Sequence, residues 1–398
     1  MLEELLLQSN QIIDNTEVKF LRYLHRQINW DNRLIAIKGA RGSGKTTLIL
    51  QHIALNHKIN SSVLYISLED LYFLENTLLS LADEFVLNGG QYLFLDEVHK
   101  YPDWAREIKL MYDKHKKLKV VFTSSSVSEI NKAKFDLSRR AVEYSLKELS
   151  LREYIELESG IKLPSYNFKE LLTNHTEITK KITEKIKVIF WFNKYVKKGA
   201  YPYIIESEKD YAQKLKNTIN VILENDLPAV YKIDFALIYK LKKLLYAVAT
   251  SVPFKPNISK LSEKIGISRP TLLLFLNYLE KSELIYQLFP KKTGISSMTK
   301  PEKIYLHNTN LSDVISKQNF NVGNIRETFF INQVSTEETI NYSAVTDFIV
   351  NGKYSFEIGG RNKQQKQIKN LKNAYIVKDN IERGMENIIP LWLFGFLY

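Results

Sequence analysis

"KGARGSGKTT", from Lys38 to Thr47, is the stretch that decides how the first part of this chain folds. It fits the pattern G-x-x-x-x-G-K-[ST], with Gly39, Gly44, Lys45 and Thr46 at the specified positions. Glycine-rich backbone lets consecutive N–H groups curl around phosphate oxygens, and a helix that begins there adds its positive end. The residues expected to bind a nucleotide are therefore Gly39, Ala40, Arg41, Gly42, Ser43, Gly44, Lys45, Thr46 and Thr47.

The pattern is informative only where a strand precedes the loop and a helix follows it. "RLIAIK" (Arg33–Lys38) is a β-favouring run, and "TTLILQHIALNH" (Thr46–His57) has apolar spacing compatible with a helix. In that setting Lys45 reaches the β- and γ-phosphates and the Thr46 hydroxyl binds Mg²⁺. The alternative, a glycine-rich turn without a ligand, is the weaker interpretation of the complete pattern. The predicted cofactors are ATP and Mg²⁺.

A second stretch, "GGQYLFLDEVHKYPDW" (Gly89–Trp104), adds two acidic residues. Its apolar part, Tyr92–Leu95, predicts a strand, and Asp96 and Glu97 follow at the carboxyl end, where open α/β sheets place their ligands. We expect Asp96 to hold the Mg²⁺ shell and Glu97 to polarise an attacking water. A buried strand that ends in a solvated acidic turn is the alternative, and the upstream phosphate loop weighs against it.

A third predicted strand, "LKVVFTSSS" (Leu118–Ser126), ends in hydroxyl groups. Thr123 and Ser124 are candidates to contact the γ-phosphate or the attacking water. Hydroxyls that cap a turn or the next helix are an equally good explanation.

Two adjacent arginines, Arg139 and Arg140, precede a further predicted strand in "DLSRRAVEYSLKELSLREY" (Asp136–Tyr154). An arginine there is a candidate to stabilise transition-state charge, either in its own subunit or in a neighbouring one. A solvated or salt-bridging arginine is the alternative, and both interpretations stay open.

Composition limits the class of protein. A chain of 398 residues predicts two or three domains. No window approaches the ~20 apolar residues of a membrane span, and the amphipathic start "MLEELLLQSNQIID" has no basic leader, so we expect a cytoplasmic protein without a membrane partner. The absence of cysteine excludes disulfides and thiolate metal sites. The net charge of +12 permits attraction to nucleic acid without demonstrating it.

Together these stretches, with "KKGAYPYIIE" further along (Lys197–Glu206), resemble the prokaryotic ATPases in which an N-terminal AAA-type domain precedes a C-terminal domain of unknown function. The resemblance covers most of the chain. It implies an α/β P-loop NTPase core at residues 1–155, of the class with a catalytic glutamate and with strand order 5-1-4-3-2. Alternating strands and helices are all that the sequence itself predicts for this region.

Two further modules are predicted after this core. Residues 156–250 are mostly helical by pattern and form a linking region that breaks at Gly199 and Pro202. Residues 251–310 have the order of a winged helix-turn-helix: a short helix, a turn at Gly266, a second helix and a β-like run. The residues expected to contact DNA, if DNA is the partner, are Ser268, Arg269, Thr271, Lys291 and Lys292. The apolar centre of the second helix equally fits a module that packs against protein.

The last module, residues 311–398, resembles a small α/β restriction-endonuclease-like domain. Such nucleases use a helical Glu, an Asp and a Glu-x-Lys, and here Glu327, Asp347 and Glu357 match the acids. Gly359 stands where the lysine belongs, with Lys363 or Arg361 as substitutes from the following turn. We therefore expect an inactive or regulatory remnant, and a surface hairpin with incidental acids is the alternative.

Three functional hypotheses follow. The main one is an ATPase whose nucleotide binding and hydrolysis act on the C-terminal modules. The others are a nucleotide-switched regulator that binds DNA with little turnover, and an ATP-gated nuclease. ATP is the predicted partner in all three, and double-stranded DNA, further copies of this chain or an unknown protein are the candidate macromolecular partners.

Overall fold

The computed structural model describes residues 1–57, 60–125, 137, 139–251, 255–290, 300–316, 322–364 and 368–398. The chain divides into two compact units, Met1–Glu148 and Leu149–Tyr398. The first unit thus ends before the domain boundary expected at residue 155. The subdivision of the second unit into three modules stays a prediction.

The first unit is built on a five-stranded parallel sheet with strand order β2-β3-β4-β1-β5. Read from the other edge this is the order 5-1-4-3-2, so that expectation is confirmed. The strands are β1 (Leu34–Gly39), β2 (Val63–Ser67), β3 (Tyr92–Asp96), β4 (Lys119–Ser125) and β5 (Val142–Ser145). The helices are α1 (Leu2–Asp14), α2 (Leu24–Gln27), α3 (Lys45–Asn56), α4 (Leu78–Leu87) and α5 (Trp104–Lys114).

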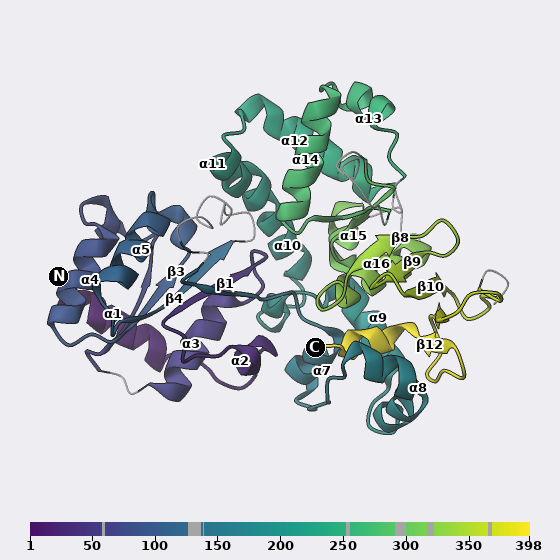
Figure 1. Cartoon of the computed structure of the whole chain (residues 1–398), viewed down its shortest axis with the longest axis horizontal. Helices are drawn as coiled ribbons and strands as arrows, with labels where there is room; N and C mark the ends of the chain where they lie inside the picture. The colour runs from purple at the N-terminus through teal and green to yellow at the C-terminus, as the bar shows by residue number, and fades with distance from the viewer. Residues whose placement is uncertain are drawn as a thin grey trace. The chain divides into compact units, whose positions relative to one another are not determined.

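Both faces of this sheet are covered because side chains alternate along each strand. In β1, Leu34 and Ala36 belong to a core shared with α4 and α5, while Ile35 and Ile37 belong to a second core shared with α3. Figure 1 shows the strands between these two helical layers. The sheet is therefore buried on both faces, and the loops that leave the carboxyl ends of its strands lie along one edge.

Helix α1 lies along the edge strand β2. Ser9 on α1 is buried, and its hydroxyl accepts a hydrogen bond from the Tyr65 backbone N–H at 2.9 Å. An exposed strand edge would otherwise be a template for pairing with another chain. The amphipathic N-terminal helix expected from the sequence is confirmed, and it protects this edge.

The second unit opens with a mainly helical region, as expected. Its α-helices are α7 (Leu151–Ser159), α8 (Phe168–Thr183), α9 (Val188–Lys198), α10 (Tyr211–Val221), α11 (Leu227–Tyr231) and α12 (Phe235–Ala249), with a π-helical turn at Ile222–Asp226. Helix α9 ends at Gly199, and a short 3₁₀ helix begins at Pro202. The predicted break is thus present.

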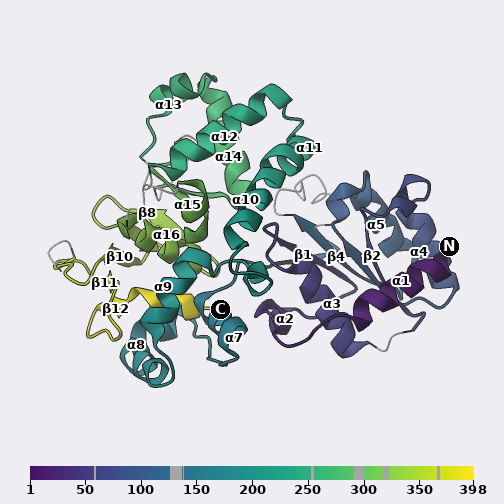
Figure 2. The ribbon, with the colours of Figure 1, turned by 180° about the vertical axis from the view of Figure 1, so that it is seen from behind.

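A helix-turn-helix and a hairpin follow. Helix α13 (Ile258–Ile265) ends at Gly266, whose φ of 73° is left-handed. Helix α14 (Arg269–Lys281) begins after Ser268, and β6 (Ile285–Leu288) pairs antiparallel with β7 (Lys303–Leu306). Figure 2 shows α12, α13 and α14 gathered together. The order of elements expected for residues 257–290 is the order observed.

The last part of the second unit is a five-stranded mixed sheet of order β12-β11-β10-β9-β8. Strand β9 pairs antiparallel with both β8 and β10. Strand β11 pairs parallel with both β10 and β12. The strands are β8 (Ile340–Tyr342), β9 (Phe348–Val350), β10 (Tyr354–Gly359), β11 (Ala374–Lys378) and β12 (Ile388–Pro390), and the helices before them are α15 (Thr309–Ile315) and α16 (Val322–Val334).

Within the described part of the chain, every helix is too short or too polar to span a lipid bilayer.

Candidate functional site

The loop between β1 and α3 has the backbone that its glycines allow. Gly42 and Gly44 have φ values of 80° and 93°, in the left-handed region that favours glycine. The Lys45 side chain is buried and folds back over the loop, where its Nζ donates to the carbonyls of Gly39 at 3.0 Å and Ala40 at 3.1 Å. An ammonium held at the centre of a ring of backbone is positioned for phosphate oxygens.

Gly39 is required by a close approach. A Cβ at this position would lie 2.2 Å from the Leu146 carbonyl oxygen, because the chain leaving β5 passes directly over the start of the loop. The Ser43 hydroxyl, in contrast, is buried and has no hydrogen-bond partner among the described residues. A buried polar atom without a partner marks a place where a polar ligand fits.

The metal-binding residues expected from the sequence lie together. The Thr46 hydroxyl at the start of α3 donates to Asp96 Oδ2 at 2.7 Å, and Thr123 at the end of β4 donates to Asp96 Oδ1. The Tyr65 hydroxyl also donates to Asp96 Oδ2, at 3.1 Å. A hydroxyl and a carboxylate are the hard oxygen ligands that Mg²⁺ prefers, so the donor set fits this ion.

Glu97 projects from a strained turn next to this pair. Its φ of 53° is left-handed, an uncommon conformation for a residue with a side chain, and its N–H donates to Thr123 Oγ1 at 3.0 Å. Burial raises the pKa of the Glu97 carboxyl, and the positive charge of Lys45 partly offsets this by lowering it. His99 Nε2 lies 3.4 Å from Glu97 Oε2. A buried carboxyl with a raised pKa is a candidate for proton transfer, so the role expected of Glu97 stays a prediction.

Two family models match the chain. Residues 31–155 match a family described as an AAA domain. Residues 31–155 form an AAA-type P-loop domain. Residues 189–342 match a domain of unknown function, DUF8612.

One curated relative is similar to this chain over a longer stretch than the AAA-type domain. An uncharacterized protein of Methanocaldococcus jannaschii is 28% identical over 289 residues, which are 69% of this chain and 61% of that protein. The chain thus spans less than two thirds of that relative's length.

Three solved structures have TM-scores of 0.25 to 0.26 and support no conclusion at that level. A structure on katanin self-assembly is 15% identical and covers 46% of this chain and 68% of its own. PCH-2 of C. elegans is 16% identical, with 70% and 66% covered, and AMPPCP-bound DnaA from Aquifex aeolicus is 13% identical, with 68% and 86% covered.

The remaining candidates of the AAA-type domain fall into two groups. Ser124 is buried beside Thr123, and its hydroxyl has no hydrogen-bond partner among the described residues. The Arg140 guanidinium pairs with the Asp113 carboxylate on α5 at 3.0 Å, and Arg139 is exposed. Ser124 thus lies with the site, whereas Arg140 is held by an ion pair at the surface, and the catalytic role of both arginines stays a prediction.

Sequence reasoning missed three residues of this site. Tyr65 and His99 contact the two acidic residues. Arg22 is buried and donates to the Ser43 carbonyl inside the loop. His99 lies within the same short stretch as Asp96 and Glu97 and could have been suspected, but nothing in the sequence around Tyr65 or Arg22 indicates a contact with the loop.

Three of the predicted DNA-contact residues, Ser268, Arg269 and Thr271, lie at the start of α14. The Ser268 hydroxyl accepts from the Thr271 N–H at 3.2 Å and pairs with the Thr271 hydroxyl at 2.7 Å, so both take part in the helix cap. Arg269 is exposed. Lys291 and Lys292 lie outside the described residues.

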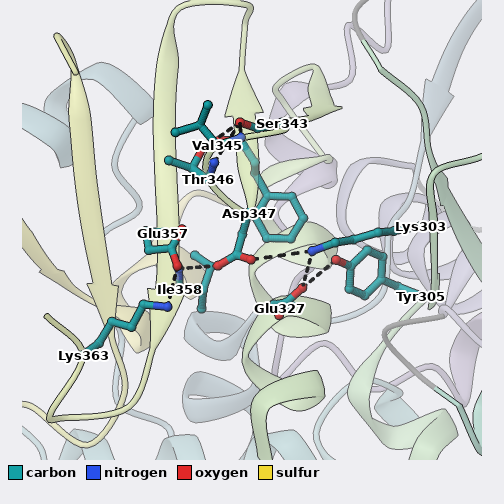
Figure 3. Close-up of polar contacts among 11 residues, drawn as sticks. Lys303, Tyr305, Glu327, Ser343, Val345, Thr346, Asp347, Glu357, Ile358 and Lys363 are labelled. Carbon is teal, nitrogen blue, oxygen red and sulfur yellow. Dashed lines mark hydrogen bonds and ion pairs between the residues drawn. The ribbon is translucent and has the colours of Figure 1, made fainter. Parts of the chain in front are cut away.

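The three acids expected from nuclease resemblance do converge. Glu327 on α16, Asp347 before β9 and Glu357 on β10 lie near one another at the mixed sheet, with Asp347 drawn between the other two (Figure 3). Burial, followed by the charge of Asp347, raises the pKa of Glu327. Burial also raises the pKa of Glu357. The alternative of a surface hairpin with incidental acids does not describe this arrangement, because Glu357 is buried.

Proposed function

We propose that this chain is an ATPase whose AAA-type domain binds Mg-ATP and hydrolyses it. The observation that carries the proposal is the 2.7 Å contact between Thr46 and Asp96 at the end of the phosphate loop, with Glu97 as the next residue. These oxygens come from a helix start and a strand end that only the folded sheet brings together. A glycine-rich turn without a ligand does not account for the contact between Thr46 and the Asp96 carboxylate.

Each residue has a role in the proposed reaction. The loop N–H groups and Lys45 bind the β- and γ-phosphates, and Thr46 and Asp96 would hold Mg²⁺, which neutralises charge on the phosphates when bound. Glu97 accepts the proton of the attacking water, and the burial that raises its pKa makes this carboxylate a stronger base. Thr123 fixes the Glu97 backbone, and Ser124 contacts the γ-phosphate or the water.

The test is phosphate release from Mg-ATP by the full chain, compared with that of Glu97→Gln. Loss of a general base lowers such rates by about 10²–10⁴-fold, and we expect a decrease in that range with ATP affinity retained. Lys45→Ala is the matched control, and it should lose affinity for ATP itself. An unchanged rate in Glu97→Gln would remove the catalytic residue from the proposal.

A second candidate function is a nucleotide-switched regulator that binds double-stranded DNA. It is favoured by the order of α13, α14 and the β6–β7 hairpin, which is the order expected of a winged helix, and by the exposed Arg269 at the start of α14. The test is DNA affinity at several salt concentrations with and without ATP. Binding whose logarithm falls with log[salt], and which Arg269→Ala weakens, supports this function, whereas a flat and weak response excludes it.

Two further measurements on the same proteins test for DNA and for further copies of this chain as partners. Stimulation of phosphate release by DNA would join the two functions, and a rise in molar mass on addition of ATP would indicate assembly of further copies of this chain. Arg139 is the candidate to act on a neighbouring subunit, because Arg140 is already paired with Asp113.

A further inference from the structure

The acidic centre of the second unit contains cations supplied by the chain itself. Lys303, on strand β7, places its Nζ 3.4 Å from Glu327 Oε2 and 3.6 Å from Asp347 Oδ1. The ammonium thus lies between two of the three acids, as Figure 3 shows. Its side chain is only 12% exposed, so the charge is held away from water and close to its partners.

Hydrogen bonds from within the second unit also hold two of these acids in place. Glu327 Oε2 accepts from the Tyr305 hydroxyl at 2.6 Å. Asp347 Oδ2 accepts from the Ile358 N–H at 2.8 Å. The turn before Asp347 is held by the Ser343 hydroxyl, which accepts from the Val345 and Thr346 N–H groups at 3.2 and 3.0 Å.

The third acid, Glu357, is paired with a lysine that comes from a position other than 359. Lys363, in the turn after β10, forms an ion pair with Glu357. A Cβ at Gly359 would lie 2.6 Å from Lys363 Cγ and 2.7 Å from its Cβ and Cδ. The stem of Lys363 therefore fills the space that a side chain at position 359 would need. Of the two substitutes considered, it is Lys363 that reaches the centre, while Arg361 is exposed.

The arrangement does not fit the metal centre that nuclease resemblance implies. Lys303 pairs with Glu327 and Asp347, and Lys363 pairs with Glu357. Two ammonium groups thus neutralise most of the negative charge that would attract a divalent cation. Among the described residues, no group of three or more His, Cys, Asp or Glu side chains has the geometry to hold a metal ion. Binding a metal here would require Lys303 to leave.

We infer that the acidic centre of Glu327, Asp347 and Glu357 is a cation site filled from within, in which Lys303 excludes divalent metal ions. The centre therefore supports no metal-dependent cleavage. It joins strand β7 to α16 and to the mixed sheet through charge. Removal of the Lys303 ammonium uncovers a site for one hard divalent cation between Glu327 and Asp347. This inference does not depend on ATP hydrolysis by the other unit.

The test is a titration of the nucleotide-free full chain with Mn²⁺, followed by the loss of the free-ion signal in electron paramagnetic resonance. All variants carry Asp96→Asn, which removes the proposed metal ligand of the first unit. We expect no Mn²⁺ bound up to about 1 mM, the weak end of protein sites for hard divalent cations. Lys303→Met should add one equivalent, and a further Asp347→Asn should abolish it. Lys303→Arg retains the positive charge and should bind none.

Three outcomes would overturn the inference. One is a bound Mn²⁺ in the Asp96→Asn protein that Asp347→Asn removes. Another is a folded Lys303→Met protein that still binds none. The third is nicking of plasmid DNA with Mn²⁺ that depends on Glu357, tested with Glu357→Gln. If Lys303→Met does not fold, as judged by circular dichroism, the first and third comparisons decide the matter with Lys303 in place.

Discussion

Arg22 donates from its buried guanidinium to the carbonyl of Ser43, inside the phosphate loop. The same guanidinium donates to the carbonyls of Lys147 at 2.7 Å and Glu148 at 3.0 Å, the last residues of the first unit. One side chain therefore holds both the loop and the segment by which the chain leaves the sheet.

We predict that Arg22→Met lowers the free energy of unfolding of the first unit and weakens ATP binding. Hydrogen bonds from a charged donor contribute about 1.5–3 kcal/mol each, and the variant loses all three while leaving the carbonyls buried. Arg22→Lys keeps the positive charge but lacks the planar guanidinium. Its free energy of unfolding and its ATP affinity should therefore lie between those of the unsubstituted chain and of Arg22→Met. Urea denaturation and ATP titration measure both effects. Equal midpoints and equal affinities in all three proteins would show that the contacts contribute nothing.

Thr123→Val should lower the rate of phosphate release and leave ATP affinity nearly unchanged. Its hydroxyl donates to Asp96 and accepts from the Glu97 N–H, so its loss removes one hydrogen bond from each acidic residue. Two such bonds correspond to a decrease of about 10–100-fold. Thr123→Ser retains the hydroxyl and is the matched control. A normal rate in Thr123→Val, measured at saturating ATP, would mean that the hydroxyl does not position the base.

A cluster of histidines predicts acid sensitivity of the first unit. Burial, with smaller contributions from His25 and His57, lowers the pKa of His52 to about 3. The ring stacks on Trp30 with centroids 3.5 Å apart. Because the folded pKa is below the unfolded value of about 6.5, the unfolded state binds more protons below pH 6.5, and stability falls as the pH decreases toward 3.

We expect the free energy of unfolding to decrease by roughly 1–2 kcal/mol between pH 6.5 and pH 5 on account of His52. His52→Gln cannot take up this proton and should lose less stability over the same interval, whatever its stability at pH 7. Chemical denaturation at the two pH values measures the difference. The same decrease in the variant would assign the acid sensitivity to other groups.

Asn310 on α15 is fully buried and acts as an internal cap for helix α9. Its amide nitrogen donates to the carbonyls of Tyr195 at 3.0 Å and Val196 at 3.1 Å, and its oxygen accepts from the Ala200 N–H at 2.8 Å. Asn310→Asp turns the donor into an acceptor that faces two carbonyls.

The expected loss for Asn310→Asp is about 3 kcal/mol or more, since buried polar groups lose their partners and a charge is buried. The exposed Asn217→Asp is the control and should change stability by less than about 0.5 kcal/mol. Thermal unfolding of the full chain compares the two. Similar melting temperatures would mean that the structure around Asn310 relaxes at little cost.

The sequence predicted features that depend on short, local patterns. The loop of Gly39 to Thr47 and the acidic pair after β3 carry their chemistry within a few residues, so their partners could be inferred without a fold. The turn at Gly266 and the cap at Ser268 are local in the same way.

Contacts between distant segments could not be predicted. Arg22 and Ser43 are 21 residues apart in the sequence, Lys303 and Glu327 are 24 residues apart, and both pairs meet only in the folded chain. A lone arginine or lysine has no neighbour in the sequence that indicates such a partner. The acids of the mixed sheet were found by resemblance, and Lys363 was named as a substitute for the missing lysine, but Lys303 between Glu327 and Asp347 was not foreseen.

Residues 391–398 have a consequence for how the second unit folds. Residues 391–398 are all buried, and the Tyr398 carbonyl accepts from the Ser150 hydroxyl at 2.9 Å and from Arg152 at 2.8 Å. The core around α7 thus needs the last residues to be complete. During synthesis, the core around α7 is therefore complete only once residue 398 has left the ribosomal exit tunnel.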